Sequence, residues 1–522
     1  MSSGFAWSIC LVGMEARPVR VEAHISDGMT AYSLVGLPDT AVREAKDRVR
    51  AAVTSCLYEW PGTRIVLNLS PASLPKTGSG YDLAMAVSVL AAMGVISRSR
   101  AGQCIMLGEL GLDGRVIGIR GILPSVIGAM KTGKTKILVP QANLAEASLV
   151  PGVDVEGVHH LGQVIELLGG DLMMPLPPPE DPAGAEDGEN TPSPALGTGG
   201  DFSDIRGQAA ACQAMEVAAA GGHHLLMIGT PGSGKTMLAS RLPGILPPLD
   251  VEQSVEVTAL HSLAGTLAPQ DGLIRQPPFQ APHHSATLAA MVGGGSGVPR
   301  PGAASLAHRG VLFLDEAPEF GARVLDSLRE PLENGEITLH RAAGAAQYPA
   351  RFQLIMAANP CPCGNAGSRR ATCTCTPYSR KRYLERLSGP LLDRMDIQIQ
   401  VESPGRGSLA GAKPADTTAV VAARVQRARD VQRERWKDRG WDLNREIPGP
   451  FLRQPEGGFT PELIGRVDTV VEQGRLSMRG AQRVLRLAWT VADLSGKTVP
   501  GLAELGTAMT LRRQNEGFSL HV

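Results

Sequence analysis

A glycine-rich stretch at residues 229–236 constrains this chain more than any other feature. It fills every fixed position of the pattern G-x-x-x-x-G-K-[ST], and it lies between an apolar run at 225–228 and the expected start of a helix. In such a loop backbone N–H groups surround the phosphates, Lys235 reaches the β and γ oxygens, and the Thr236 hydroxyl can hold Mg²⁺. The predicted site for a nucleoside triphosphate consists of Gly229, Thr230, Pro231, Gly232, Ser233, Gly234, Lys235 and Thr236.

Two acidic residues follow a second apolar run, 311–314, some way beyond the loop. Asp315 is placed to hold Mg²⁺ through water, and Glu316 to polarise the water that attacks the triphosphate. A third strand-like run, 352–357, leads to Asn359, whose amide can orient that water without adding charge. From local chemistry alone, Asn359 can equally be a turn residue before Pro360.

Length and charge limit the alternatives. The chain has 522 residues, enough for several domains, and its 51 basic and 51 acidic residues balance, so no global field favours nucleic acid or membranes. The longest apolar run, 83–96, is shorter than the roughly 20 residues that span a bilayer. The first residues carry no signal-peptide pattern. We therefore expect a cytoplasmic protein without a membrane partner.

Four of the eight cysteines lie close together in the sequence. In a reducing compartment such packing favours a metal site over disulfides, and four thiolates suit a tetrahedral structural Zn²⁺. The C-x-C spacing departs from the commoner C-x₂-C knuckle, and two disulfides or four free thiols remain alternatives. The predicted ligands are Cys361, Cys363, Cys373 and Cys375.

Composition divides the chain into four regions. Residues 171–200 are rich in proline, glycine and acids and read as a flexible linker after an N-terminal domain at 1–170. In residues 201–402, strand-like and helical patterns alternate, which predicts an α/β fold with a doubly wound parallel sheet. Residues 403–522 are predicted to form a helical lid. Its expected helices are 417–439, 461–473, 477–495 and 502–513.

Residues 201–402 resemble the AAA+ ATPases, and within them the magnesium-chelatase-like group. The resemblance implies ATP and Mg²⁺ as cofactors and the AAA+ fold with a helical lid. Six blocks carry it in addition to the phosphate loop: Asp204-Ile205-Arg206-Gly207-Gln208, Pro282-His283-His284-Ser285, Leu306-Ala307-His308-Arg309-Gly310, Asp315-Glu316, Ala358-Asn359-Pro360 and Ser388-Gly389-Pro390-Leu391-Leu392-Asp393-Arg394.

The same resemblance implies roles for three further residues. Asn359 matches the first sensor, Arg394 matches the arginine that a neighbouring subunit inserts at the γ-phosphate, and Arg479 matches the sensor arginine of the lid. A guanidinium can stabilise charge on the transferring phosphoryl group. Without the resemblance, Arg394 reads equally as part of a surface ion cluster and Arg479 as a solvated helix start. A finger supplied by a neighbour implies a homo-oligomeric, hexameric ring.

The group also carries insertions that reach into the ring pore. Residues 279–302 match the insert in the second helix, and residues 337–351 read as a hairpin before the sensor strand. His340 and Arg341 would then face a substrate strand. His283 and His284 read as hydrogen-bonded structural residues more readily than as metal ligands.

Residues 1–170 resemble the proteolytic domain of Lon-type proteases. Such proteases need a serine nucleophile and a lysine base, but Gly80 and Leu123 stand where these two residues should fall, and Ser79 is one position off. A serine without a base in reach is a poor nucleophile. We therefore expect an α+β domain that is not proteolytic and serves as a scaffold or a DNA-binding collar.

The order of these regions resembles the ComM/YifB-type proteins from end to end. That resemblance implies a hexameric branch-migration helicase in recombination or natural transformation, with branched or single-stranded DNA and recombination proteins as partners. The alternatives are a magnesium-chelatase ATPase subunit and a protein remodeller. Basic residues that could contact DNA are Arg341, Arg369, Arg370, Arg424, Arg427, Arg429, Arg433 and Arg435, although the last five alternate with acids and read more simply as a solvated helix face.

Overall fold

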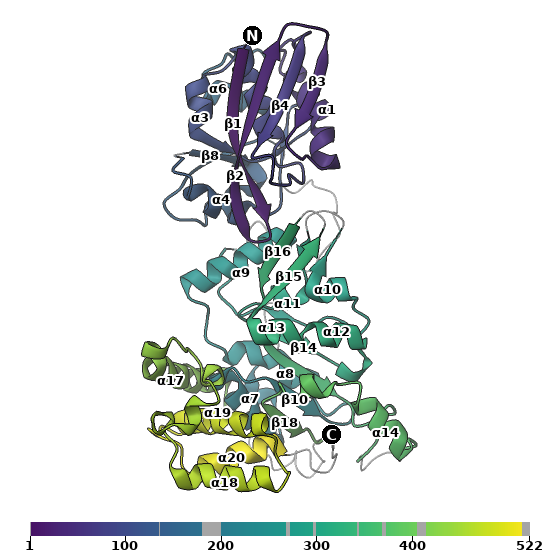
Figure 1. The fold of residues 1–522 in the computed structure, drawn as a ribbon, viewed down its shortest axis with the longest axis vertical. Coiled ribbons are helices and arrows are strands. Elements are labelled where there is room, and N and C mark those ends of the chain that lie inside the picture. Colours follow the sequence, from purple (N-terminus) through teal and green to yellow (C-terminus); the bar gives the residue numbers. More distant parts are fainter. Residues whose placement is uncertain are drawn as a thin grey trace.

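The structure of the protein is a computed structural model. It describes residues 2–134, 136–179, 200–267, 272–295, 299–341, 344–367, 372–403 and 414–513. Figure 1 shows the N-terminal part at one end of the long axis, the part with the phosphate loop in the middle, and a group of helices at the other end. Most of the predicted linker, residues 180–199, lies outside the described residues.

The N-terminal part is built on a mixed sheet of seven strands, with the order β3-β4-β2-β1-β5-β8-β9. Helix α2 is buried along nearly its whole length against β1 and β2, because its sequence is almost entirely apolar. This arrangement agrees with the expected α+β fold. The strands are β1 Ser2–Val12, β2 Glu15–Ser26, β3 Ala31–Val35, β4 Arg64–Ser70, β5 Cys104–Met106, β6 Glu109–Leu110, β7 Val116–Ile117, β8 Lys136–Pro140 and β9 Asp154–Val158. The helices are α1 Thr40–Ser55, α2 Asp82–Met93, α3 Arg98–Gln103, α4 Ile122–Met130, α5 Leu144–Ala147 and α6 Leu161–Leu167.

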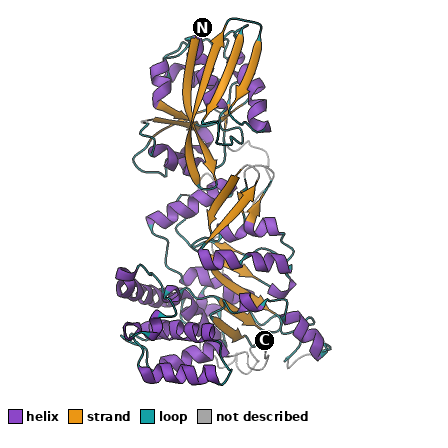
Figure 2. Cartoon of the chain, in the orientation of Figure 1, coloured by secondary structure: helices purple, strands orange, loops and turns teal. Residues whose placement is uncertain are grey.

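The middle part contains the predicted doubly wound sheet. Its five strands are all parallel, in the order β11-β14-β17-β10-β18. Side chains alternate between two cores: Leu225 and Met227 of β10 enter one, and Leu226 and Ile228 enter the other. Helices cover both faces (Figure 2), which explains why β10 and β14 are apolar throughout. The strands are β10 Leu225–Ile228, β11 Phe279–Gln280, β14 Val311–Leu314, β17 Gln353–Ala358 and β18 Ile397–Gln400.

The helices and hairpins around this sheet include both insertions. The segment predicted as a helix insert contains α10 and the short pair β12 and β13, and the predicted hairpin is formed by β15 and β16. The helices are α7 Ala209–Gly221, α8 Lys235–Ile245, α9 Val251–Ala264, α10 Leu288–Val292, α11 Ala303–Leu306, α12 Ala322–Ser327, α13 Arg329–Asn334, α14 Pro377–Leu384 and α15 Gly389–Leu392. The remaining strands are β12 Gly293–Gly294, β13 Arg300–Pro301, β15 Glu336–Arg341 and β16 Gly344–Pro349.

The C-terminal part is helical, as predicted. Helix α19 has a pronounced apolar face, and its buried residues join the same core as one face of the five-stranded sheet. Four aromatic rings, those of Trp436, Trp441, Phe451 and Trp489, pack together between α17 and α19. The helices are α17 Thr418–Trp436, α18 Pro461–Glu472, α19 Met478–Leu494 and α20 Leu502–Arg513.

The N-terminal part rests on α9 and on the β15–β16 hairpin (Figure 1). Ala259 of α9 joins the apolar cluster that contains Leu123 of α4, and Met14 packs against the cluster that contains Tyr348 of β16. The hydroxyl of Ser262 donates a hydrogen bond to the Glu146 carboxylate. The Lon-like part is therefore seated on α9 and on the hairpin, one of the two insertions that were predicted to reach the pore.

Within the described segments, we find no helix that is both long and apolar enough to span a membrane.

Candidate nucleotide-binding site

The phosphate loop connects the end of β10 to the start of α8 at the carboxyl edge of the sheet, the edge where the parallel strands end. Gly232 and Gly234 have φ values of 73° and 87°, a region that glycine adopts without steric cost. A side chain at Gly229 would meet the Val401 carbonyl oxygen at 2.4 Å. A cavity of about 350 Å³ lies over the loop, lined by residues 231–236, Asp315, Glu316 and Asn359. The structure thus brings the predicted loop, acids and sensor amide together.

Lys235 is directed into this cavity and is only 8% exposed. Its ammonium group donates to the carbonyl oxygens of Gly229 (2.7 Å) and Thr230 (3.2 Å) and to Oδ1 of Asn359 (3.2 Å). Burial lowers the pKa of Lys235, while the nearby carboxylates of Asp315 and Glu316 oppose that shift. The lysine and the sensor amide are therefore coupled by a direct hydrogen bond.

The two candidate Mg²⁺ residues are in contact. The Thr236 hydroxyl donates a hydrogen bond of 2.6 Å to Oδ2 of Asp315. A hydroxyl and a carboxylate at this separation supply hard oxygen ligands of the kind that Mg²⁺ prefers. Thr236 and Asp315 would hold the ion, which would neutralise phosphate charge when bound.

Glu316 occupies a strained position next to this pair. Its φ of 50° lies in the left-handed region, which is uncommon for a residue other than glycine, and its N–H donates to Oδ1 of Asp315 (2.9 Å). Nδ1 of His284 lies 3.3 Å from the Glu316 carboxylate. Sequence reasoning treated His284 as structural and missed this contact, because it joins two segments that follow different strands.

The sequence did not identify Gln208 as a residue that contacts the phosphate loop. Its side-chain amide donates to the Ser233 carbonyl of the phosphate loop (2.6 Å) and to the Glu402 carbonyl (3.0 Å). The chain segment before the sheet is thereby fastened to the loop and to the end of β18. The only sequence signal was its place in the block Asp204–Gln208.

The two candidate arginines lie at the opposite edge of the sheet. Arg394 precedes β18, whose first residue, Ile397, pairs with Leu225 at the start of β10, so Arg394 is at the amino edge. It is 14% exposed and forms an ion pair with Glu333. Arg479 is 73% exposed and pairs with Asp393 at 3.2 Å. Neither arginine lines the cavity over the phosphate loop of its own chain.

The four predicted zinc ligands converge. Their sulfur atoms all lie within 4.8 Å of one another, with Cys361–Cys363, Cys363–Cys373 and Cys361–Cys373 at 3.4, 3.6 and 3.7 Å. Tetrahedral bonds of about 2.3 Å to zinc place sulfur atoms roughly 3.8 Å apart, so the set fits. Backbone N–H groups, the Asn365 N–H first among them, lower the pKa of Cys363 to about 5, which favours the thiolate that binds metal.

This cysteine cluster touches the phosphate loop. Gly364 approaches so closely that a side chain there would meet Pro231 at 2.5 Å. Cys361 also follows the sensor Asn359 by two positions. Loop, sensor and cysteine cluster therefore form one contiguous unit.

The predicted basic residues have diverse environments. Arg424 pairs with Glu216 and Asp416, the half-buried Arg429 donates to the Ala219 carbonyl, and Arg435 pairs with Asp493. These three contacts fasten α17 to neighbouring parts of the chain, and contact of these arginines with DNA stays a prediction. Arg427 and Arg433 are exposed. Arg369, Arg370 and the side chain of Arg341 lie outside the described residues.

The histidines of the insertions are also placed. Nδ1 of His283 lies 2.8 Å from the Ser285 hydroxyl, and its ring stacks on His284 at 4.1 Å. His340 is exposed on the hairpin. The hydrogen-bonded interpretation of the His283–His284 pair agrees with these contacts, apart from the additional partner Glu316.

In the Lon-like part, a cavity of about 690 Å³ borders Ser79 and Gly80 and extends to Arg300 of the helix insert. Ser79 donates to Glu109, and none of the described residues that line the cavity is a lysine. Leu123 is fully buried in an apolar cluster. The geometry gives Ser79 no lysine base, although the absence of peptidase activity stays a prediction.

A five-stranded parallel sheet with the phosphate loop on an inner strand, followed by a helical lid, defines a P-loop protein of the AAA+ class. Three family matches cover most of the chain: "Magnesium chelatase, subunit ChlI" at 201–409, "Subunit ChlI of Mg-chelatase" at 21–143 and "Magnesium chelatase, subunit ChlI C-terminal" at 415–512. The chain belongs to the magnesium-chelatase-like family of ComM/YifB-type proteins. This family suggests an ATPase that uses Mg²⁺.

Full-length relatives support this assignment. An uncharacterized protein of Mycobacterium tuberculosis is 48% identical over 516 residues, 98% of this chain and 99% of its own. The uncharacterized protein YifB of Escherichia coli is 41% identical (98% and 97% covered), and the competence protein ComM of Haemophilus influenzae is 40% identical (97% of each). Lon protease 1 of Herpetosiphon aurantiacus is 36% identical over 98 residues, 18% of this chain and 12% of the protease.

Proposed function

We propose that this chain hydrolyses ATP as a ring-shaped motor and acts on DNA as a branch-migration helicase. The observation that carries the proposal is the separation of the catalytic groups. Lys235, Thr236, Asp315, Glu316 and Asn359 meet at the carboxyl edge of the sheet, whereas Arg394 lies at the amino edge. One chain by itself holds an incomplete site.

A neighbouring copy completes that site in this proposal. Its Arg394 would reach the γ-phosphate, where a guanidinium stabilises the charge that develops during transfer. Arg479, 73% exposed on the same side as Arg394, would be presented to the same nucleotide. Such head-to-tail contacts close into rings, and a hexamer is the ring that we propose.

Within the site, each residue has a proposed role. Glu316 polarises the attacking water, Asn359 orients it, and Lys235 binds the β and γ oxygens. Release of Lys235 from the Gly229 carbonyl would let its ammonium group turn to phosphate. Thr236 and Asp315 hold Mg²⁺, which neutralises the triphosphate when bound.

DNA is the proposed substrate because of the family. The competence protein ComM is 40% identical along 97% of both chains. The exposed His340 is carried on a hairpin beneath the Lon-like part, where a strand passing through the ring could be contacted. Branched DNA, single-stranded DNA and recombination proteins are the proposed partners.

Zinc is the proposed occupant of the cysteine cluster. The converging sulfur atoms support it. The ion would be structural, since four protein ligands leave no open position for a substrate. It would hold Gly364 against Pro231 of the phosphate loop.

ATP hydrolysis with and without DNA tests this function. The purified full chain would be assayed alone, with single-stranded DNA and with four-way junctions, beside Glu316→Gln. We expect stimulation by junctions and loss of hydrolysis in the variant. If no form of DNA changes the rate of ATP hydrolysis, the result would favour the chelatase-subunit or protein-remodelling alternatives instead.

A further inference from the structure

A second cavity, of about 530 Å³, lies between the amino edge of the sheet and the helical part of the chain. It is separate from the phosphate loop, because its walls include the residues that precede β10, β17 and β18. An adjoining cavity of about 640 Å³ shares several of its residues, Arg309, Arg351 and Arg445 among them. The six arginines that line the first cavity are Arg309, Arg351, Arg394, Arg445, Arg483 and Arg486.

Half of these arginines are neutralised within the protein. Arg309 pairs with Glu256, Arg394 with Glu333 and Arg483 with Asp396. Across the described residues, the other three form no ion pair at all. They are Arg351, Arg445 and Arg486.

Carbonyl oxygens accept hydrogen bonds from two of them. Arg445 donates to the Gly222 carbonyl (3.0 Å), and Nε of Arg486 donates to the Ile447 carbonyl (2.7 Å). Burial lowers the pKa of both guanidinium groups, while the carboxylate of Asp396 opposes that shift in both and that of Glu446 opposes it in Arg445. Four carboxylates line the cavity, those of Glu333, Asp396, Asp442 and Glu446, against six arginines, so positive charge is in excess and an anion entering the cavity would stabilise it.

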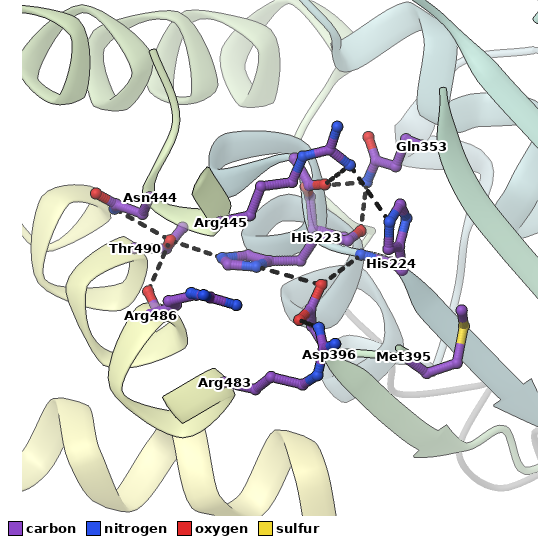
Figure 3. Close-up of polar contacts among 12 residues, drawn as sticks. His223, His224, Gln353, Met395, Asp396, Asn444, Arg445, Arg483, Arg486 and Thr490 are labelled. Carbon is purple, nitrogen blue, oxygen red and sulfur yellow. Dashed lines mark hydrogen bonds and ion pairs between the residues drawn. The ribbon is translucent and has the colours of Figure 1, made fainter. Parts of the chain in front are cut away.

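The histidine in the wall offers a further donor (Figure 3). Burial lowers the pKa of His224 to about 3, so the ring is neutral at physiological pH. Its Nδ1 accepts a hydrogen bond from the Leu354 N–H (3.0 Å), and the proton must therefore reside on Nε2. Nε2 lies 3.5 Å from a guanidinium nitrogen of Arg445, and two donors cannot satisfy each other. An acceptor from outside the chain would serve both.

The backbone fixes Arg351 at the mouth of this cavity. The N–H of Arg309, a residue with a φ of 60°, donates to the Arg351 carbonyl oxygen (2.8 Å). The Arg351 N–H donates to Nδ1 of His308 (2.9 Å). A large residue in the left-handed region, such as Arg309, persists only where its surroundings hold it. The backbone of Arg351, which is hydrogen-bonded to Arg309, is therefore fixed, and the exposed Arg351 side chain extends from this fixed position.

We propose that this cavity binds a ligand bearing two or more linked phosphate groups, apart from the site at the phosphate loop. Planar guanidinium forks match phosphate oxygens, and several unneutralised forks match a chain of phosphates better than a single carboxylate. The phosphates belong to a free ligand, and contact with the nucleotide of an adjacent copy is the alternative that the test separates. The proposal does not depend on DNA being the substrate.

Calorimetric titration with inorganic pyrophosphate tests the free-ligand source. The full-length chain would carry Lys235→Ala, which removes the main cation of the phosphate loop. We expect binding that Arg351→Glu weakens by about tenfold or more and that Arg351→Lys largely retains. Arg64→Glu, the same charge reversal at an exposed strand end far from the cavity, should leave the affinity unchanged.

The second arm tests the alternative, that these arginines act only on the nucleotide of an adjacent copy. ATP hydrolysis is measured with Lys235 intact, at protein concentrations above and below assembly, for Arg351→Glu and Arg64→Glu. If pyrophosphate does not bind, or if Arg351→Glu and Arg64→Glu affect its binding equally, the proposal is overturned. Slower hydrolysis by assembled Arg351→Glu alone would then assign Arg351 to the neighbour's nucleotide.

Discussion

Nδ1 of His284 lies 3.3 Å from the carboxylate of Glu316, the residue proposed to polarise the attacking water. His284 follows β11, and Glu316 follows β14, so the contact joins the ends of two adjacent parallel strands. A carboxylate that is engaged by a neighbouring side chain is less available as a base. His284 therefore restrains Glu316.

Replacing His284 by alanine should raise ATP hydrolysis in the absence of DNA. The loss of this partly exposed contact, worth about 0.2–1 kcal/mol, predicts an increase of about 1.5- to 5-fold. His283→Ala is the control, because it leaves the partner of Glu316 in place. A slower rate for His284→Ala, with His283→Ala unaffected, would mean instead that His284 positions Glu316 for the reaction.

Two defective variants should restore activity to each other. Lys235→Ala lacks the phosphate-loop cation but keeps Arg394, whereas Arg394→Ala keeps a complete phosphate loop. Each alone should lose about 10³-fold or more in hydrolysis, and a mixture should recover a measurable part, because mixed assemblies contain intact pairs. Arg466→Ala changes an exposed ion pair on a helix, and this control variant should hydrolyse ATP without being mixed with a second variant. If the mixture stays as inactive as its components, Arg394 does not act on the neighbouring copy.

The purified chain should contain about one zinc ion per molecule, measured by elemental analysis. Cys373→Ser should lose the metal and bind ATP more weakly, because Gly364 of the cluster packs on Pro231. Cys212→Ser changes a partly buried cysteine outside the cluster and should alter neither property. Full zinc content with unchanged ATP affinity in Cys373→Ser would separate the cluster from the phosphate loop.

Stability should fall as the pH drops below about 6.5. Burial lowers the pKa of His224 to about 3 from its ordinary 6.5, so the unfolded chain takes up the proton first. The contribution of His224 is complete above pH 6.5, decreases as the pH falls, and levels off below about 3. The slope is about 1.4 kcal/mol per pH unit for one proton.

Chemical denaturation between pH 7.5 and 5 can isolate this contribution. His224→Asn keeps an acceptor for the Leu354 N–H but cannot take up the proton, so its stability should depend less steeply on pH. Burial also lowers the pKa of His223, His261 and His308, and some slope should remain. His24→Asn, at an exposed histidine, should match the unmodified chain. Parallel curves for His224→Asn and the unmodified chain would contradict the assignment.

Local pattern predicted much of the fold. The apolar runs at 225–228 and 311–314 became β10 and β14 with the same bounds, because strands that are buried on both faces stand out as uninterrupted apolar residues. The run at 352–357 was displaced by one residue, since Phe352 lies next to β17 without pairing in its ladder. Boundaries of this kind depend on hydrogen-bond partners in other strands.

Contacts between distant segments were harder to predict. The spacing in α17 suggested a solvated basic face, yet Arg424 and Arg435 pair with acids on α7 and α19. His284 and Glu316, or Gly364 and Pro231, meet only because the sheet order places their segments side by side. No local periodicity in the sequence predicts such contacts.

The placement of Arg394 at one edge of the sheet and the phosphate loop at the other has a consequence for how a ring would open. In the proposed assembly every active site belongs to a boundary between two copies and none belongs to a copy. Opening one boundary to admit a DNA strand would stop ATP hydrolysis at that boundary alone, while every closed boundary kept a complete active site. At each boundary, entry of DNA and ATP hydrolysis would then be mutually exclusive, without any separate inhibitor.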